Sequence, residues 1–356
     1  MTILWSAARY AGANARVHAL FARFIPPALW AELLEAATVA DLCHLLLQSW
    51  YREKLAALTA APPDEIQLER ALTRHWVWAA RLPFGLLQGT SRDLLEWHWR
   101  RHELNNLKTI LRAIHRQTPP EQVLPALISL GTPTELPWTT LATVSSIAAL
   151  VERLRATWYG QVLQPALEEY RRQQSVFVLE VALDLAYYRR LRDLAAQLHG
   201  RDRQEADQTI GFWIDAQNLL WAYRYRLYAQ LSPEEILNYT LQRNLRVNAR
   251  VVRAIALGAP LLATVQSIWP DQIAGLDALT GLADRDALPR LELLLWRHLY
   301  ARAVQMRTTA ALQLGTVLAY KVLLESEVRD LVTIIEGKVF QRSGAQLQPY
   351  LIGRRG

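Results

Sequence analysis

The apolar residues of this chain recur mainly at spacings of three and four positions, which is the period of an amphipathic α-helix. The first segment with this pattern ends at Pro26 and Pro27, and further helices are predicted over Ala28 to Leu34 and Thr38 to Leu58. The side chains that carry the pattern in these segments are Tyr10, Val17, Leu20, Phe21, Phe24, Leu42, Leu45, Leu46 and Leu55. The pattern predicts an all-α protein.

A proline-rich turn precedes the next predicted helix. Pro62, Pro63, Asp64 and Glu65 combine prolines near a first turn with acids that suit the positive end of the helix dipole. The helix continues as L-E-R-A-L, and the related sequences L-E-V-A-L and L-E-L-L-L occur later in the chain. The glutamates of the three copies, separated by 111 and 112 positions, are Glu69, Glu180 and Glu292. This regular separation indicates an internal repeat.

A second recurring segment has the same period. Residues 103–112 read E-L-N-N-L-K-T-I-L-R, residues 215–224 read D-A-Q-N-L-L-W-A-Y-R, and residues 327–336 read E-V-R-D-L-V-T-I-I-E, each 112 positions after the one before. Each copy has an acid, an amide or its acidic isostere, and a leucine at matched positions: Glu103, Asn106 and Leu107; Asp215, Asn218 and Leu219; Glu327, Asp330 and Leu331. Because the two markers recur together with the same period, they predict three multi-helix repeats of about 112 residues.

Helical geometry places the acid and the amide of this motif beside its apolar side. At about 100° per residue, Glu103 and Asn106 border the apolar stripe, whereas Arg112 lies opposite Glu103. Polar residues at the edge of a buried stripe usually bond to a neighbouring helix, so we interpret the pair as structural. A partner-binding role is the alternative. Arg112 and Arg224 face away and are the candidate partner contacts, while copy three has Glu336 at that position.

A third marker is found in the first two copies only. Ser49-Trp50-Tyr51 and Thr157-Trp158-Tyr159 each follow a leucine-rich helix and lie 108 positions apart, and no third copy is placed. Together the markers predict one continuous domain made of three helical repeats. The predicted repeats span residues 1–130, 131–245 and 246–356.

The composition supports a large helical core. Of 356 residues 51% are hydrophobic, and only 15 Gly and 16 Pro interrupt segments rich in helix formers. The single cysteine, Cys43, excludes an intrachain disulfide, as is usual in a reducing cytoplasm. The amino terminus lacks a secretory pattern, and the longest apolar runs fall short of the roughly 18 to 20 residues of a membrane span. We therefore expect a soluble chain that meets a membrane only peripherally.

A net charge of +7 permits attraction to nucleic acid, anionic lipid or an acidic protein surface. Aromatic and basic residues interleave at residues 97–101 and 221–226, which is a possible stacking surface for single strands. Because no nucleic-acid motif accompanies them, we interpret these residues as packing aromatics beside solvated arginines. No nucleic-acid partner is expected.

The sequence contains no recognisable catalytic or cofactor motif. It has neither a glycine-rich phosphate loop nor H-E-x-x-H, so no nucleotide, cofactor or metal is expected. His98 and His102 have the spacing with which one helix presents two imidazoles to zinc. Because no third ligand is in view, we interpret them as half-exposed polar residues beside the motif.

The threefold recurrence of the motif at residues 103–112, 215–224 and 327–336 resembles the central-stalk C subunit of archaeal and bacterial V/A-type rotary ATPases. The counterpart of that subunit in the eukaryotic proton pumps is the d subunit. The closest match is residues 103–113, and residues 10–16 and 325–338 are similar to the family's amino-terminal and carboxy-terminal segments. The resemblance covers essentially the whole chain.

The resemblance implies a funnel of three helical units around a pseudo-threefold axis. Such a protein sits as one copy on the cytoplasmic face of the membrane, between the central shaft and the rotor ring that carries protons or sodium ions. It binds no nucleotide and catalyses no reaction, but passes torque for ATP-linked ion transport. The alternative is a free-standing helical repeat adaptor that binds other proteins, and a helical enzyme ranks last.

Overall fold

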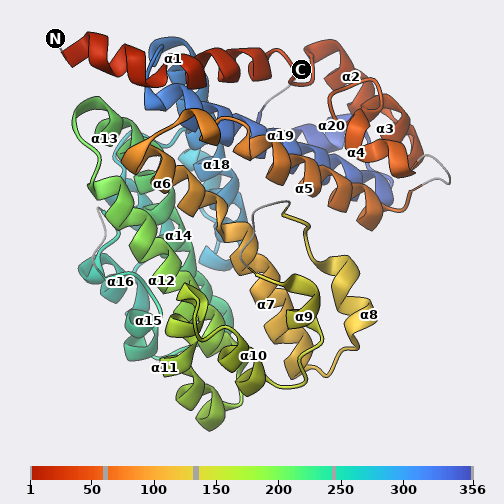
Figure 1. The fold of residues 1–356 in the computed structure, drawn as a ribbon. Helices are drawn as coiled ribbons and strands as arrows, with labels where there is room; N and C mark the ends of the chain where they lie inside the picture. Colours follow the sequence, from red (N-terminus) through yellow and green to blue (C-terminus); the bar gives the residue numbers. More distant parts are fainter. Residues whose placement is uncertain (1, 59–62, 131–135, 243–245, 354–356) are drawn as a thin grey trace. The chain divides into compact units, whose positions relative to one another are not determined.

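The computed structural model describes residues 2–58, 63–130, 136–242 and 246–353. Every regular element in these ranges is helical, so the predicted all-α class is confirmed (Figure 1). The chain divides into two compact units: Met1–Asp93 with Ala195–Gly356 form unit 1, and Leu94–Leu194 form unit 2. This division follows lines other than the predicted repeat boundaries, and the three-repeat division stays a prediction.

Unit 1 combines helices from both ends of the chain. Its amino-terminal helices are α1 (Thr2–Phe21), α2 (Pro27–Glu35), α3 (Val39–Leu46), α4 (Arg52–Leu55) and α5 (Glu65–Arg81). Its later helices are α13 (Gly200–Ala206), α14 (Phe212–Arg224), α15 (Pro233–Asn238), α16 (Ala249–Ala256), α17 (Leu261–Ile268), α18 (Asp284–Thr309), α19 (Leu314–Val339) and α20 (Gly344–Leu347). Its 3₁₀ turns are Ala56–Leu58, Phe84–Leu86, Leu276–Leu279 and Gln348–Tyr350, and π-helical turns at Asp207–Gly211 and Tyr225–Ala229 flank α14.

Local sequence signals account for several helix boundaries. Asp64 Oδ1 accepts a hydrogen bond from the Gln67 N–H at 2.7 Å, and this capping box begins α5 at Glu65, the last residue of the predicted turn. Pro62 of that turn lies outside the described residues. The single helix predicted over Thr38 to Leu58 is wrong, because α3 ends at Leu46 and α4 is a separate turn. The Ser49 hydroxyl donates to the Leu46 carbonyl at 2.6 Å and satisfies a carbonyl at the end of α3.

The core of unit 1 is organised around α19. Buried side chains lie on nearly every side of this helix, as expected for a helix inside a bundle rather than on its surface. Helices α1, α5, α13 and α18 pack against it, and Figure 1 shows α1 and α5 running along it. One apolar cluster joins α2 to α5 with α19 and α20, and another joins α14 to α18.

Unit 2 is smaller and is built around α7. Its helices are α7 (Arg101–His115), α8 (Pro120–Val123), α9 (Trp138–Ala142), α10 (Ile147–Arg153) and α11 (Trp158–Gln173), with a 3₁₀ turn at Leu124–Ala126. Two helices, α6 (Gly89–Trp99) and α12 (Val176–Ala196), cross its boundaries with unit 1. Within the described residues, no helix combines the length and the apolar run that crossing a bilayer requires.

Candidate functional site

Two of the three motif acids accept a hydrogen bond from a tyrosine. Glu103 on α7 is buried, and its Oε2 accepts from the Tyr159 hydroxyl at 2.5 Å. Glu327 on α19 is also buried; its Oε1 accepts from the Tyr51 hydroxyl at 2.9 Å and its Oε2 from the Ile25 N–H at 3.1 Å. Burial, with the nearby Glu103 carboxylate, raises the pKa of Tyr159, so its hydroxyl remains a donor at neutral pH. The two tyrosines are the matched residues of the third sequence marker.

The acid of copy two, Asp215 on α14, has backbone partners instead. Its Oδ1 accepts from the Val247 N–H at 3.0 Å, and its two oxygens lie 3.2 and 3.1 Å from the Arg246 nitrogen. Burial raises the pKa of Asp215 to about 6, although the backbone donors and Arg246 favour the charged form. Each acid thus bonds to the predicted repeat that follows its own, and the acid of copy three bonds to copy one.

The motif amides clamp a segment 22 or 23 positions further along the chain. Asn106 Nδ2 donates to the Ile128 carbonyl and Asn106 Oδ1 accepts from the Ile128 N–H, both at 2.9 Å. Asn218 Oδ1 accepts from the Leu241 N–H at 2.7 Å, and its Nδ2 donates to the carbonyls of Leu241 and Val247 at 2.8 Å. The side-chain amide supplies the donor and the acceptor that each returning backbone segment requires.

Copy three has an aspartate at this position, and in the described residues two N–H groups of the segment after α20 donate to it. Asp330 Oδ1 accepts from the Ile352 N–H at 2.6 Å, and Oδ2 accepts from the Gly353 N–H at 3.0 Å. Two carboxylate oxygens match two N–H groups, which an amide cannot do. The change from amide to acid is therefore a local adjustment of the same contact.

The motif leucines lie in the core. Leu107, Leu219 and Leu331 are each at most 1% exposed. They occupy the apolar side of α7, α14 and α19 respectively, next to the acids and amides described above. Acid, amide and leucine thus lie together at the buried side of each helix.

The motif arginines pair with the glutamates of the first sequence marker. Arg112 and Glu180 form a two-pronged ion pair, with Nε to Oε1 at 2.5 Å and Nη2 to Oε2 at 2.7 Å. Arg224 Nη2 lies 2.5 Å from Glu292 Oε2. The Arg112 side chain is still 54% exposed, so it has room for a further contact. The contact of Arg112 and Arg224 with a partner protein stays a prediction.

The third position of this series holds two acids. Glu336 replaces the arginine on α19 and acts on Glu69 of α5, the matched glutamate. Burial raises the pKa of Glu69, and repulsion by Glu336 adds to the increase. In the described part of the chain neither carboxylate has an ion-pair partner. The first two matched pairs, Arg112–Glu180 and Arg224–Glu292, are thus ion pairs, whereas the third, Glu336 and Glu69, consists of two like charges.

Ser267 lies 110 positions after Thr157 and makes a bond like those of Ser49 and Thr157 in the third sequence marker. Ser267 Oγ donates to the Thr264 carbonyl at 2.7 Å at the end of α17. The Ser49 hydroxyl donates in the same way to the Leu46 carbonyl at the end of α3. The Thr157 hydroxyl donates to the Leu154 carbonyl at 2.7 Å, just before α11. Ser267 lies inside α17, and Ile268 and Trp269 stand where the first two copies have tryptophan and tyrosine.

A buried histidine lies behind Tyr51. The His75 ring is fully buried, 4.3 Å from the Tyr51 ring and 4.7 Å from the Trp50 ring between centroids. Within the described residues neither ring nitrogen has a hydrogen-bond partner. Burial, with Lys54 nearby, lowers the pKa of His75 to about 3, so the ring is neutral at physiological pH.

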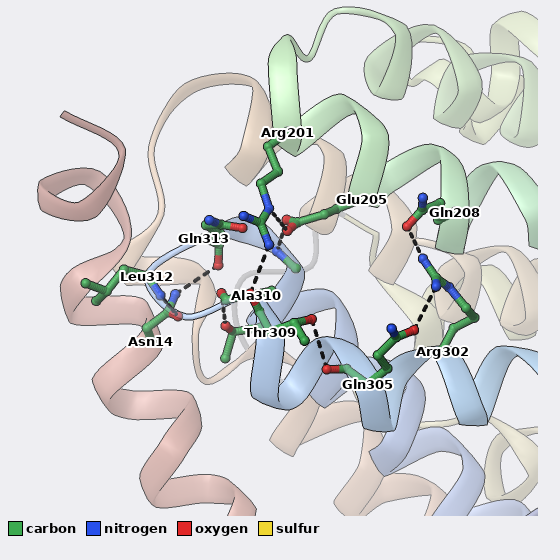
Figure 2. Close-up of polar contacts among 12 residues, drawn as sticks. Asn14, Arg201, Glu205, Gln208, Arg302, Gln305, Thr309, Ala310, Leu312 and Gln313 are labelled. Atoms are coloured by element: carbon green, nitrogen blue, oxygen red, sulfur yellow. Dashed lines mark hydrogen bonds and ion pairs between the residues drawn. The ribbon is translucent and has the colours of Figure 1, made fainter. Parts of the chain in front are cut away.

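Polar side chains also fix the loop before α19, and they belong to none of the recurring sequence motifs. Asn14 of α1 is buried; its Oδ1 accepts from the Leu312 N–H at 2.8 Å and its Nδ2 donates to the Gln313 carbonyl at 3.0 Å. Figure 2 shows Asn14 directed from its helix toward these two residues of the loop. A lone amide on the apolar side of a predicted helix was the available signal.

The amino terminus of α19 is capped from α13. Glu205 is buried, and its Oε2 accepts from the Gly315 N–H at 2.6 Å. Arg201 bonds both to Glu205 Oε1 at 3.3 Å and to the Thr309 carbonyl at 2.9 Å, as Figure 2 shows. A carboxylate at a helix amino terminus is favoured by the free N–H groups and the helix dipole. The absence of a side chain at Gly315 allows this close approach, since a Cβ there would lie 2.6 Å from the carboxyl carbon.

The two histidines considered for zinc lie on consecutive helices, so the expectation that they share one helix is wrong. His98 lies in α6 and His102 in α7, and the break is at Arg100. His98 is half-buried as predicted, but His102 is only 4% exposed and packs edge-on against Trp99. In the described residues no group of three or more metal-binding side chains is assembled.

The two aromatic and basic stretches take part in packing. Trp97 Nε1 donates to the Tyr187 carbonyl at 3.0 Å, and its ring meets Trp158 edge-on. In the second stretch Tyr223 is buried and Arg226 forms an ion pair with Asp284. These contacts give both stretches structural partners within the chain.

A polar pocket of about 660 Å³ lies beside Asp215. Its charged groups are bonded to neighbours: Arg203 pairs with Asp207 at 2.7 Å, and His298 Nδ1 lies 2.9 Å from the Gln272 carbonyl. Burial lowers the pKa of His298, which keeps its ring neutral. A neutral imidazole held by a carbonyl and an acid held by an arginine do not form a nucleophile and base pair.

Residues 13–348 match the family described as ATP synthase (C/AC39) subunit. The C subunit of the A-type ATP synthase of Methanocaldococcus jannaschii is 22% identical over 97% of this chain and 86% of its own length. Its counterpart in Methanosarcina mazei is 23% identical over 92% of this chain and 89% of its own, and that in Haloquadratum walsbyi is 28% identical over 85% and 86%. The chain belongs to the ATP synthase (C/AC39) subunit family.

Proposed function

We propose that this chain is the non-catalytic central-stalk subunit of a V/A-type rotary ATPase. It couples the rotating shaft to the membrane ring and so links ATP turnover to the transport of protons or sodium ions. It lies peripherally on the cytoplasmic face of the membrane as one copy in the complex. The observation that carries the proposal is the similarity over nearly the full length to proteins named as the C subunit of A-type ATP synthases.

The internal contacts support a mechanical role. A coupling element transmits torque only if its parts do not shear, and the motif acids and amides are buried and bonded to segments far along the chain. The acid of each predicted repeat bonds to the next repeat, and the third returns to the first. This cyclic order supports three similar units in a pseudo-threefold funnel.

Co-purification of the chain from detergent-solubilised membranes tests this proposal. The shaft and ring proteins should elute with the chain in constant proportion. A chain that elutes free of both would overturn the role as a coupler and favour a free-standing adaptor.

A further inference from the structure

A groove in unit 1 is lined by the beginning of α18, the end of α19, α20 and the turn after α20. Its volume is about 890 Å³. Leu293, Leu294 and Leu347 contribute apolar surface to the lining. Phe340 and Tyr350 also line it and are 76% and 54% exposed. Such exposed aromatic side chains around an apolar hollow are typical of a protein interaction site.

The groove carries an excess of positive charge. Its lining contains Arg290, Arg297 and Arg342 against one carboxylate, Glu336. The Arg297 guanidinium is bonded to backbone carbonyls of the segment after α20. Among the described residues, Arg290 and Arg342 have no ion-pair partner, and both are exposed. These two guanidiniums are free to bind carboxylates from outside the chain.

We propose that this groove docks an acidic amphipathic helix of a partner protein in the rotary complex. Apolar side chains from one face of that helix fill the hollow between α18 and α19, and its carboxylates bind Arg290 and Arg342. This is the helix-in-groove mode of recognition, in which apolar anchors give affinity and charges give orientation. The inference rests on the proposed function, since it assigns a surface to one of the other proteins of that complex.

Charge and shape select this occupant over two others. A second copy of the chain carries a net charge of +7 and would bring positive charge to a positive groove. Leu293, Leu294 and Leu347 line a hollow, which a single helix can enter and a flat membrane surface cannot fill. A helix of opposite charge matches both the depth and the sign of the site.

Photo-crosslinking in the purified complex tests the proposal. p-Benzoylphenylalanine in place of Phe340 should join the chain to one peptide of another protein of the complex, and that peptide should contain several Asp or Glu residues. The double variant Arg290→Glu, Arg342→Glu should reduce the crosslink about tenfold or more, because it opposes like charges at the contact. The matched control is Arg250→Glu, Arg253→Glu on α16, which makes the same change of charge at exposed residues outside the groove.

The outcomes separate this inference from the proposed function. A chain that elutes without the shaft and ring proteins defeats the proposed function. If the chain co-purifies but both double variants crosslink as well as the unmodified protein, only the groove assignment is overturned. Crosslinking to vesicles of phosphatidylcholine and phosphatidylglycerol, in place of a peptide, overturns it in favour of a lipid surface. An equal loss in both double variants also overturns it, because the effect would then follow net charge alone.

Discussion

At the scale of single residues, the recurring motif is explained by the backbone groups that each side chain meets. Asn218 faces two carbonyls and one N–H, whereas Asp330 at the matched position faces two N–H groups. Buried polar atoms left without a partner cost about 1–3 kcal/mol each. The chemical identity of each side chain should therefore be strictly required, although amide and carboxylate have the same shape.

Exchanging the two side chains tests this requirement. Asn218→Asp removes both donors to carbonyls, and Asp330→Asn removes one acceptor, so each change should lower the free energy of unfolding by about 2–3 kcal/mol. Urea denaturation measures the effect. Asn105→Asp, at an exposed position of the same motif, is the control and should have little effect. Equal stability of the Asn218→Asp and Asn105→Asp proteins would contradict the account of the clamp.

The buried ring of His75 should make the protein sensitive to acid. Its pKa is about 3 in the folded chain and near 6.5 when unfolded, so the unfolded state takes up the proton first as pH falls. The contribution of His75 to the free energy of unfolding is complete above about pH 6.5. Below that pH the contribution falls progressively, by about 2–3 kcal/mol at two pH units lower. His75→Phe should remove this part of the loss. Melting curves measured against pH would contradict the prediction if the two proteins lost stability in parallel.

At the scale of elements, the position of α19 depends on the contacts at its first turn. Glu205 approaches the Gly315 N–H so closely that even a methyl group would displace the carboxylate. Asn14 fixes the preceding loop from α1, so two distant helices hold the same helix start.

Gly315→Ala should therefore destabilise the protein although alanine favours helix. Displacing Glu205 and crowding Ala310 should together cost about 2–3 kcal/mol, which exceeds the gain of about 1 kcal/mol from helix propensity. Thermal denaturation provides the measurement. Gly85→Ala, where nothing lies near the added Cβ, should leave the melting temperature nearly unchanged. A Gly315→Ala protein as stable as this control would show that the close approach is not required.

The sequence predicted the helical class and the buried side of each motif helix because both follow from the local period of apolar residues. It did not predict partners, since Tyr51 and Glu327 are 276 positions apart and spacing on one helix does not identify its neighbour. The helix breaks at Leu47 and Arg100 were missed because the three- and four-residue spacing of apolar residues continues across them. Glu205 was missed because its partner is a backbone N–H 110 positions away, and Asn14 because a lone amide on an apolar side does not identify the loop that it binds.

At the scale of the whole molecule, the three copies of the motif make the same kinds of contact with one exception. Arg112 and Arg224 pair with glutamates, but Glu336 meets Glu69. The exception lies on α19, which also lines the groove assigned above to an acidic helix. The carboxy-terminal end of α19 is therefore the part of unit 1 where we expect the similarity between copies to give way to partner binding.

The central claim is that the chain couples the shaft to the ring, and the most direct test is ATP-driven ion uptake by vesicles that contain the reconstituted complex. Complexes assembled without the chain should still hydrolyse ATP through their catalytic head but should not transport ions. Adding the purified chain should restore transport. Full ion uptake in the absence of the chain would contradict the claim.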